Sequence, residues 1–353
     1  MKIFMNKVFQ YKTKIIILFV TILCSMTLFL LPKLPAQFFR DAQTISLLID
    51  NLNKTPVANL NITFPSSFVY SAAIYRFFGF SYLSTEIQSF IIFFLAIYII
   101  LLTVYNSRIT ILSYIFLLIS IVPLFVFQSQ LTKEIFVLPL IFFFTKSFTS
   151  TTKSQKTTSV IIFLTYFICF TLSIRNYWII TICFYCFFRV YYNFFPRHFL
   201  IFPTILMCLI CALTSNIVLH RYITDFRIQL NVGRDIVETS SIINNSVPNT
   251  SVSSDFFNLI TISLKFLFPV LFLNFQKIYI ILYTITWSIF HLLIFWKWRY
   301  KFKSNTVYRH LFYLLVSFLV TQAIFEGDLG SVVKHGTGVI AIYVILLSEK
   351  KAT

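Results

Sequence analysis

Long apolar runs recur along the whole of this 353-residue chain, and they constrain its fold more than any other feature of the sequence. Most of them approach the roughly 20 residues that an α-helix needs to cross a bilayer. The runs lie at about 15–32, 87–105, 109–127, 160–174, 178–195, 199–219, 278–295 and 311–325, with shorter ones at about 135–146 and 336–348. They predict an all-α polytopic membrane protein, a single membrane domain over residues 1–353 with about ten transmembrane helices.

The composition agrees with a membrane protein. Hydrophobic residues make up 58% of the chain and charged residues only 11%, against about 25% charged in an average soluble domain. The net charge of +18 raises the question of nucleic-acid binding. However, the basic residues lie in short clusters between apolar runs and not on one polar face, so we expect no nucleic-acid partner.

The basic clusters predict the orientation, because cytoplasmic loops of membrane proteins carry an excess of Lys and Arg. An even number of crossings places both termini on one side, and the lysines near each end make that side cytoplasmic. The other clusters predicted to be cytoplasmic lie at 108, 146–156, 197 and 296–303. The run at 15–32 resembles a signal peptide, but its length and poor cleavage site favour a retained first helix.

Two further apolar segments, about 64–80 and 259–275, do not fit this orientation as crossings. Each contains a basic residue and a proline, so we interpret them as re-entrant or interfacial pieces on the outer side. The outer side then receives a first loop at 33–86, a large loop at 220–277 and a short loop at 326–335. The Ser/Thr/Asn-rich stretch 238–254 is predicted to be a solvated part of the large loop.

The six cysteines all lie in apolar runs, so no disulfide framework is predicted. Cys183/Cys186 and Cys208/Cys211 have the spacing of a zinc site, but no acidic residue or histidine that could serve as a further ligand lies near them within the runs. We interpret them as small packing residues and predict no metal and no cofactor.

Arginines on the predicted outer side oppose the charge bias, so topology does not explain them. They are Arg40, Arg76, Arg175, Arg221, Arg227 and Arg234. One interpretation is local pairing with acidic residues that lie within three positions, namely Asp41, Asp225 and Asp235. The other is an anionic ligand at the outer membrane surface, which guanidinium groups bind well.

Four of the six glycines lie between Gly327 and Gly338, close to four ionisable residues: Glu326, Asp328, Lys334 and His335. Glycine permits positive φ and close backbone approach, so this segment suggests backbone amides facing a bound polar group. A tight turn between helices is the alternative. His335, at the start of the last run, is the predicted proton acceptor.

Two other polar segments interrupt the apolar pattern. Arg175-Asn-Tyr-Trp178 places a guanidinium and two rings at an outer junction, either as an aromatic belt or as a site for phosphate and sugar. Lys133-Glu134 opens a short run that contains Pro139, either as a local salt bridge or as part of a site opened by a broken span.

These segments, in this order, resemble the Wzy and EpsG-like polysaccharide polymerases. The resemblance covers the layout of the chain and rests on about thirty residues, in Arg40-Asp41, Thr132-Lys133-Glu134, Arg175-Asn-Tyr-Trp178 and the segment from Glu326 to His335. Asn176 stands where the family commonly has proline, and Lys334 where it commonly has arginine.

The resemblance implies a glycosyltransferase of the bacterial inner (cytoplasmic) membrane. Such an enzyme polymerises undecaprenyl-pyrophosphate-linked repeat units of O-antigen or capsule at the periplasmic face, alongside membrane lipid and a chain-length regulator. Outer arginines would stabilise the leaving pyrophosphate. The expected catalytic residues are His335, Asp328, Glu326 and Asp41. The expected substrate-binding residues are Arg40, Lys133, Glu134, Arg175, Tyr177, Trp178, Arg221, Arg227, Arg234 and Lys334.

Three other classes stay open at this stage. A lipid-linked oligosaccharide flippase or another polytopic carrier predicts charges along the helices and repeated halves. An envelope acyltransferase predicts a histidine-centred site on the cytoplasmic side. A purely structural membrane subunit predicts no site.

Overall fold

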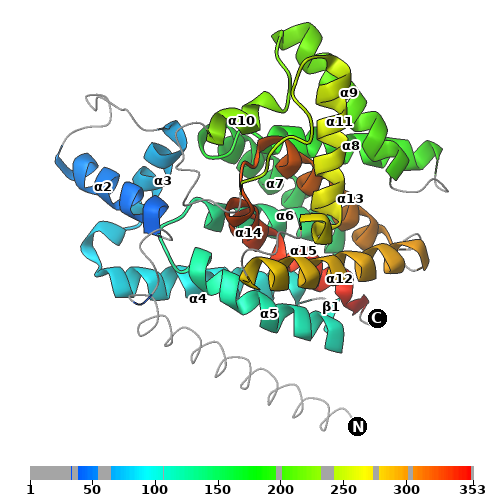
Figure 1. Cartoon of the computed structure of the whole chain (residues 1–353). Coiled ribbons are helices and arrows are strands. Elements are labelled where there is room, and N and C mark those ends of the chain that lie inside the picture. Colours follow the sequence, from blue (N-terminus) through cyan, green and yellow to red (C-terminus); the bar gives the residue numbers. More distant parts are fainter. Residues whose placement is uncertain are drawn as a thin grey trace, which may run out of the picture.

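The computed structural model describes residues 33, 39–54, 65–105, 107–195, 201–231, 242–272, 278–300 and 305–350. The regular structure in these ranges is nearly all helical (Figure 1). One small antiparallel ribbon joins β1 (Ser107–Arg108) to β2 (Glu349–Lys350). The predicted first helix at 15–32 and Arg234 lie outside the described residues.

In chain order, the described helices are α2 (Arg40–Lys54), α3 (Ser66–Phe77), α4 (Thr85–Val104), α5 (Ile111–Gln128), α6 (Val137–Thr149), α7 (Lys153–Ser173), α8 (Trp178–Phe194), α9 (Ile201–Leu219), α10 (Asp225–Asn231), α11 (Val252–Leu267), α12 (Ile278–Tyr300), α13 (Thr306–Phe325), α14 (Leu329–Gly336) and α15 (Ile340–Leu347). Short 3₁₀ turns are η4 (Phe80–Tyr82), η5 (Glu134–Phe136), η6 (Pro269–Phe272) and η8 (Thr337–Val339).

Six helical segments of the described chain are long and apolar enough to cross a membrane. They are α4, α5, α7, α9, α13 and the continuous stretch Leu329–Leu347. The predicted all-α membrane class is therefore confirmed, while the count of about ten crossings stays a prediction.

Helix lengths qualify two expectations. The 13 residues of α6 span about 20 Å, less than the roughly 30 Å hydrocarbon core. Pro139 lies in the first turn of α6, where helix N–H groups have no internal partner. It therefore leaves the helix intact, contrary to the predicted break. In the described part of the segment 64–80, Pro65 precedes α3, and in that of the segment 259–275, Pro269 follows the end of α11. Their predicted re-entrant placement stays a prediction.

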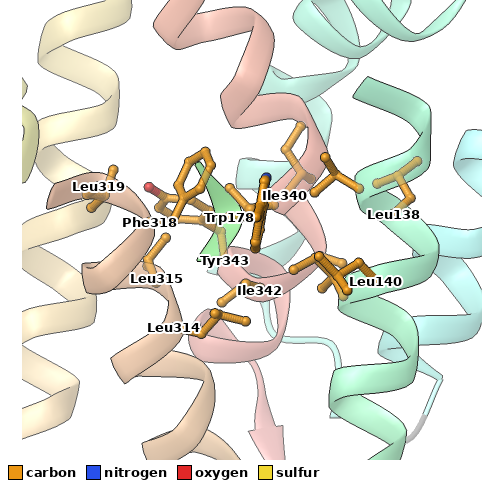
Figure 2. Close-up of a cluster of buried hydrophobic side chains, with 14 of the residues drawn as sticks. Leu138, Leu140, Trp178, Leu314, Leu315, Phe318, Leu319, Ile340, Ile342 and Tyr343 are labelled. Atoms are coloured by element: carbon orange, nitrogen blue, oxygen red, sulfur yellow. The ribbon is translucent and has the colours of Figure 1, made fainter. Parts of the chain in front are cut away.

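Helix α13 lies at the centre of the bundle, and α7 lies at its edge. In the most apolar window of each, 89% of the residues of α13 are buried but only 11% of those of α7. Figure 2 shows Leu314, Leu315, Phe318 and Leu319 of α13 among the core side chains, close to residues of α6, α8 and α15. The loop that follows α13 is therefore held by a rigid core, whereas most of α7 faces outward.

Candidate functional site

Charged side chains from four separate segments converge at one end of the bundle. We call them the charged cluster, which comprises Asp41, Lys133, Glu134, Arg175, Glu326, Lys334 and His335. They come from the start of α2, the start of η5 with the residue before it, the α7–α8 turn and the α13–α14 region. These are the segments that the sequence singled out, and the structure brings them together.

Glu134 and Arg175 form the centre of the charged cluster. The Glu134 carboxylate is fully buried and forms an ion pair with the Arg175 guanidinium. Burial raises the pKa of Glu134, but Arg175 and then His335 lower it more, so the net pKa lies well below its usual range. The expected local salt bridge between Lys133 and Glu134 is therefore wrong: the α7–α8 turn brings the arginine to the carboxylate instead.

The imidazole of His335 lies between two carboxylates. Its Nδ1 atom is 2.5 Å from Glu326 Oε1 and 3.1 Å from Gln322 Oε1. Its Nε2 atom is 3.0 Å from Arg175 Nη2 and 3.3 Å from Glu134 Oε1. With the proton on Nδ1, this nitrogen donates to Glu326, and Nε2 accepts from Arg175.

Lys334 and Asp41 form a second ion pair, which ties α14 to the start of α2. Burial raises the pKa of Asp41, whereas the charge and hydrogen bond of Lys334 lower it, and the net shift is downward. Arg40, the neighbour of Asp41, points to the exposed side of the helix.

Lys133 is the exception in the charged cluster, because its ammonium faces no carboxylate within ion-pair distance among the described residues. Its Nζ atom lies 3.5 Å from Ser67 Oγ and 3.5 Å from the centre of the Phe68 ring, and the residue is only 7% exposed. Burial, assisted by Arg175, lowers the pKa of Lys133 to about 7. An anion entering the cluster would find a cation there that is not already paired.

Two residues that the sequence analysis missed hold the charged cluster in shape. Tyr75 of α3 donates its hydroxyl to the Thr132 carbonyl at 2.8 Å and accepts from the Thr132 N–H at 3.2 Å, which fixes the loop before Lys133. Gln322 orients His335 from the last turn of α13. Each is a polar group inside an apolar run, and that was the only signal in the sequence.

The glycine-rich segment is helical, and the described part of it holds no positive-φ glycine. The expectation that backbone amides of this segment face a bound polar group therefore gains no support from a positive-φ glycine. Gly338 instead lets η8 pack closely on α6, where a Cβ atom at this position would lie 2.9 Å from Val137. Asp328 caps α14, accepting from the Ser331 N–H at 2.8 Å and from its hydroxyl at 2.9 Å. Its carboxylate thus caps a helix, and the catalytic role expected of it stays a prediction.

The two rings of the Arg175-Asn-Tyr-Trp178 segment separate. Tyr177 lies beside His335, with ring centres 6.2 Å apart, and its ring centre is 5.6 Å from the Arg175 guanidinium carbon. Trp178 is 1% exposed and packs on Phe170 and Phe318 in the core, and Figure 2 shows Trp178 with Phe318. Its predicted stacking on a sugar is therefore wrong in this arrangement, because no face of the indole is accessible.

The remaining predicted arginines do not join the charged cluster. Arg227 is fully buried and donates to the Ala323 carbonyl at 2.8 Å and to Asn245 Oδ1. Arg227 thereby fastens α10 and Asn245 to the end of α13, so the guanidinium makes structural contacts where a ligand contact was expected. Asp225, its expected partner, accepts from Asn249 instead at 2.6 Å. Arg221 lies exposed beyond the end of α9.

The described residues contain no group of three or more His, Cys, Asp or Glu side chains arranged to hold a metal ion. All four cysteines of the two CxxC spacings are free thiols. Cys183 and Cys186 are exposed on α8, and Cys208 is buried in α9.

No protein family, curated protein or solved structure matches this chain. The fold and the site therefore define the class: a helical membrane protein that carries a buried charged cluster at one end of its bundle. What this cluster does has to be argued from its own geometry.

Proposed function

We propose that this protein polymerises polyprenyl-pyrophosphate-linked oligosaccharide repeat units at the membrane surface. The observation that carries the proposal is the composition of the charged cluster. It combines an imidazole on a carboxylate with a buried lysine that has no carboxylate partner of its own among the described residues. Glycosyl transfer from a pyrophosphate needs both a base for the acceptor hydroxyl and cations for the leaving group.

An apolar groove beside the charged cluster supports a lipid-linked substrate. It has a volume of about 420 Å³ and lies between α8, α9 and α13, with Ile210, Val218 and Phe325 among its lining residues. Phe325 stacks on Tyr177 with ring centres 5.8 Å apart, so the groove leads toward Arg175. An isoprenoid chain in the groove would place its pyrophosphate near the cations.

The proposed reaction uses the cluster as follows. The acceptor hydroxyl attacks the anomeric carbon of the donor, the bond from that carbon to the pyrophosphate oxygen breaks, and the pyrophosphate leaves with the electron pair. Lys133 and Arg175 stabilise the negative charge. The hydroxyl proton passes to Nε2 of His335, which Arg175 vacates when it turns to the phosphate, and Glu326 stabilises the imidazolium through Nδ1.

A flippase or another carrier is the alternative. The charged cluster is concentrated at one end of the bundle, whereas a carrier is expected to place its charged groups near the membrane midplane. This distribution favours an enzyme over a carrier, and the proposal places that enzyme in the bacterial inner membrane.

The direct test is polymerisation by the purified full-length protein in nanodiscs supplied with undecaprenyl-pyrophosphate-linked repeat units. We expect a ladder of lipid-linked products. Lys133→Ala and His335→Ala should abolish the ladder, whereas the control Arg76→Gln, which changes an exposed side chain of α3, should not. The wild-type protein could instead produce no ladder and move the lipid-linked unit across the membrane of a sealed vesicle. That result would contradict the polymerase function and support the carrier function.

A further inference from the structure

A second pocket lies at the opposite end of α6 from Glu134, in the turn that joins α6 to α7. It has a volume of about 430 Å³, and every residue that lines it is polar, among them Lys146, Ser150, Gln155 and Thr158. Helix α6 places it about 20 Å from the charged cluster. The reaction proposed above leaves this pocket without a role.

The charge at this pocket is positive. Lys146 contacts the Phe142 ring, 5.5 Å from its centre, and faces no carboxylate within ion-pair distance in the described ranges. The sequence contains no acidic residue between Glu134 and Asp225. Glu349 also lies toward this end, in β2, where the ribbon sets it opposite Arg108.

More cations reach the same end from neighbouring helices. His310 near the start of α13 stacks on Phe148 with ring centres 4.2 Å apart, and its Nδ1 atom is 2.8 Å from the Tyr185 hydroxyl of α8. Arg309 directly precedes His310, and Arg189 lies one turn after Tyr185 on α8. These contacts therefore place both arginines near the end of α6. The pocket thus sits in a basic environment.

The helix that forms one wall of the pocket also indicates what kind of anion belongs there. The first seven residues of α7, from Lys153 to Ser159, are polar, and the helix becomes apolar at Val160. Beyond that point Ile161, Ile168 and Leu172 are each more than half exposed. The pocket is therefore at the level where a lipid headgroup meets its acyl chains, beside an apolar surface that no other described helix covers.

We propose that this pocket binds the phosphate headgroup of an anionic phospholipid, whose acyl chains lie along the outward face of α7. Lys146 provides the charge, and the Ser and Thr hydroxyls donate hydrogen bonds to the phosphate oxygens. The lipid would hold the α6–α7 hairpin in place at the membrane surface. This assignment does not depend on the polymerase function.

The test is native mass spectrometry of the full-length protein after exchange into equal amounts of phosphatidylglycerol and phosphatidylcholine. We expect retained phosphatidylglycerol to exceed phosphatidylcholine. Lys146→Gln should reduce this excess by about fivefold, the effect of one interfacial cation. Lys146→Arg should preserve the excess, and so should Arg76→Gln, which changes an exposed cation on α3.

Two outcomes would overturn the proposal. Equal retention of both lipids by the wild type, or equal losses in Lys146→Gln and Arg76→Gln, would show that no selective site exists. Displacement of the lipid by inorganic phosphate alone would assign the pocket to a soluble anion, since the acyl chains would then contribute nothing.

Discussion

The Arg175 guanidinium binds the Glu134 carboxylate across 41 positions of sequence, and His335 contacts both side chains. The pair joins the start of the α6 region to the α7–α8 turn and packs beneath the imidazole. A single arginine therefore links the proposed phosphate site to the proposed base, and each change at Arg175 should affect both.

Arg175→Lys and Arg227→Lys should have different consequences. Lysine at 175 cannot serve Glu134 and His335 together, so polymer formation should fall steeply at matched expression. Lysine at 227 loses contacts to Ala323 and Asn245, which should cost stability, about 1–3 kcal/mol, measured by thermal unfolding in detergent. Normal polymer from Arg175→Lys would leave this arginine with a structural role alone.

Glu134→Gln should destabilise the protein, because it leaves Arg175 buried without its carboxylate. Removing one partner of a buried pair costs about 3–5 kcal/mol. The double variant Glu134→Gln/Arg175→Gln should recover part of the loss, and thermal unfolding of both single variants, Glu134→Gln and Arg175→Gln, and of the double variant measures the coupling. Additive losses would show that the two side chains do not interact in the folded protein.

His335→Ala should preserve membrane insertion while cells accumulate single-repeat lipid-linked glycan. His335→Gln should not rescue, because an amide cannot accept the hydroxyl proton. Rescue by Gln would indicate that His335 only bridges Gln322 and Glu326 by hydrogen bonds. Loss of activity in Glu326→Gln beside an active His335→Ala would transfer the role of base to the carboxylate.

Binding of the lipid-linked donor should weaken as the pH rises through about 7, the value to which burial lowers the pKa of Lys133. The sign follows from the depressed pKa: the ammonium that attracts the anion is present below that pH and is lost above it. Affinity should fall by up to about tenfold per pH unit in the alkaline range. The donor is a pyrophosphate diester that does not titrate near neutrality, so Lys133→Ala should bind weakly and lack this dependence. An unchanged pH profile in that variant would move the titration to another group.

Gly338→Ala should destabilise the protein, because the new methyl group would lie 2.9 Å from Val137. Overpacking of this kind costs about 1–3 kcal/mol. Val137→Ala in the same chain should restore part of the thermal stability, because it removes the Cγ1 contact at 2.9 Å but keeps the Cβ contact at 2.9 Å. Full recovery in the double variant would contradict a contribution from the Val137 Cβ contact.

The orientation can be tested in cells with single cysteines in a cysteine-free background. A membrane-impermeant maleimide should label Ser251→Cys from outside and should not label Ser154→Cys until the cells are opened. Labelling of Ser154→Cys in intact cells would reverse the predicted topology and place the charged cluster on the cytoplasmic side.

The sequence was enough to predict the membrane class, because the length and apolarity of the runs are local properties. It also located the four polar segments that meet in the charged cluster, since ionisable residues are rare in such a chain. The apolar pattern did not reveal Tyr75 and Gln322, whose roles depend on which residues face them across the bundle.

Pairing was decided by the tertiary structure. Neighbours in sequence suggested Lys133 with Glu134 and Asp225 with Arg227, but packing brought Arg175 to Glu134 and placed Arg227 on the Ala323 carbonyl. Helix ends and core contacts likewise assigned Asp328 to a cap and Trp178 to the interior. The physical reason is that a buried charge or ring takes the partner nearest to it in space, and the packing of α13 against its neighbours sets that distance.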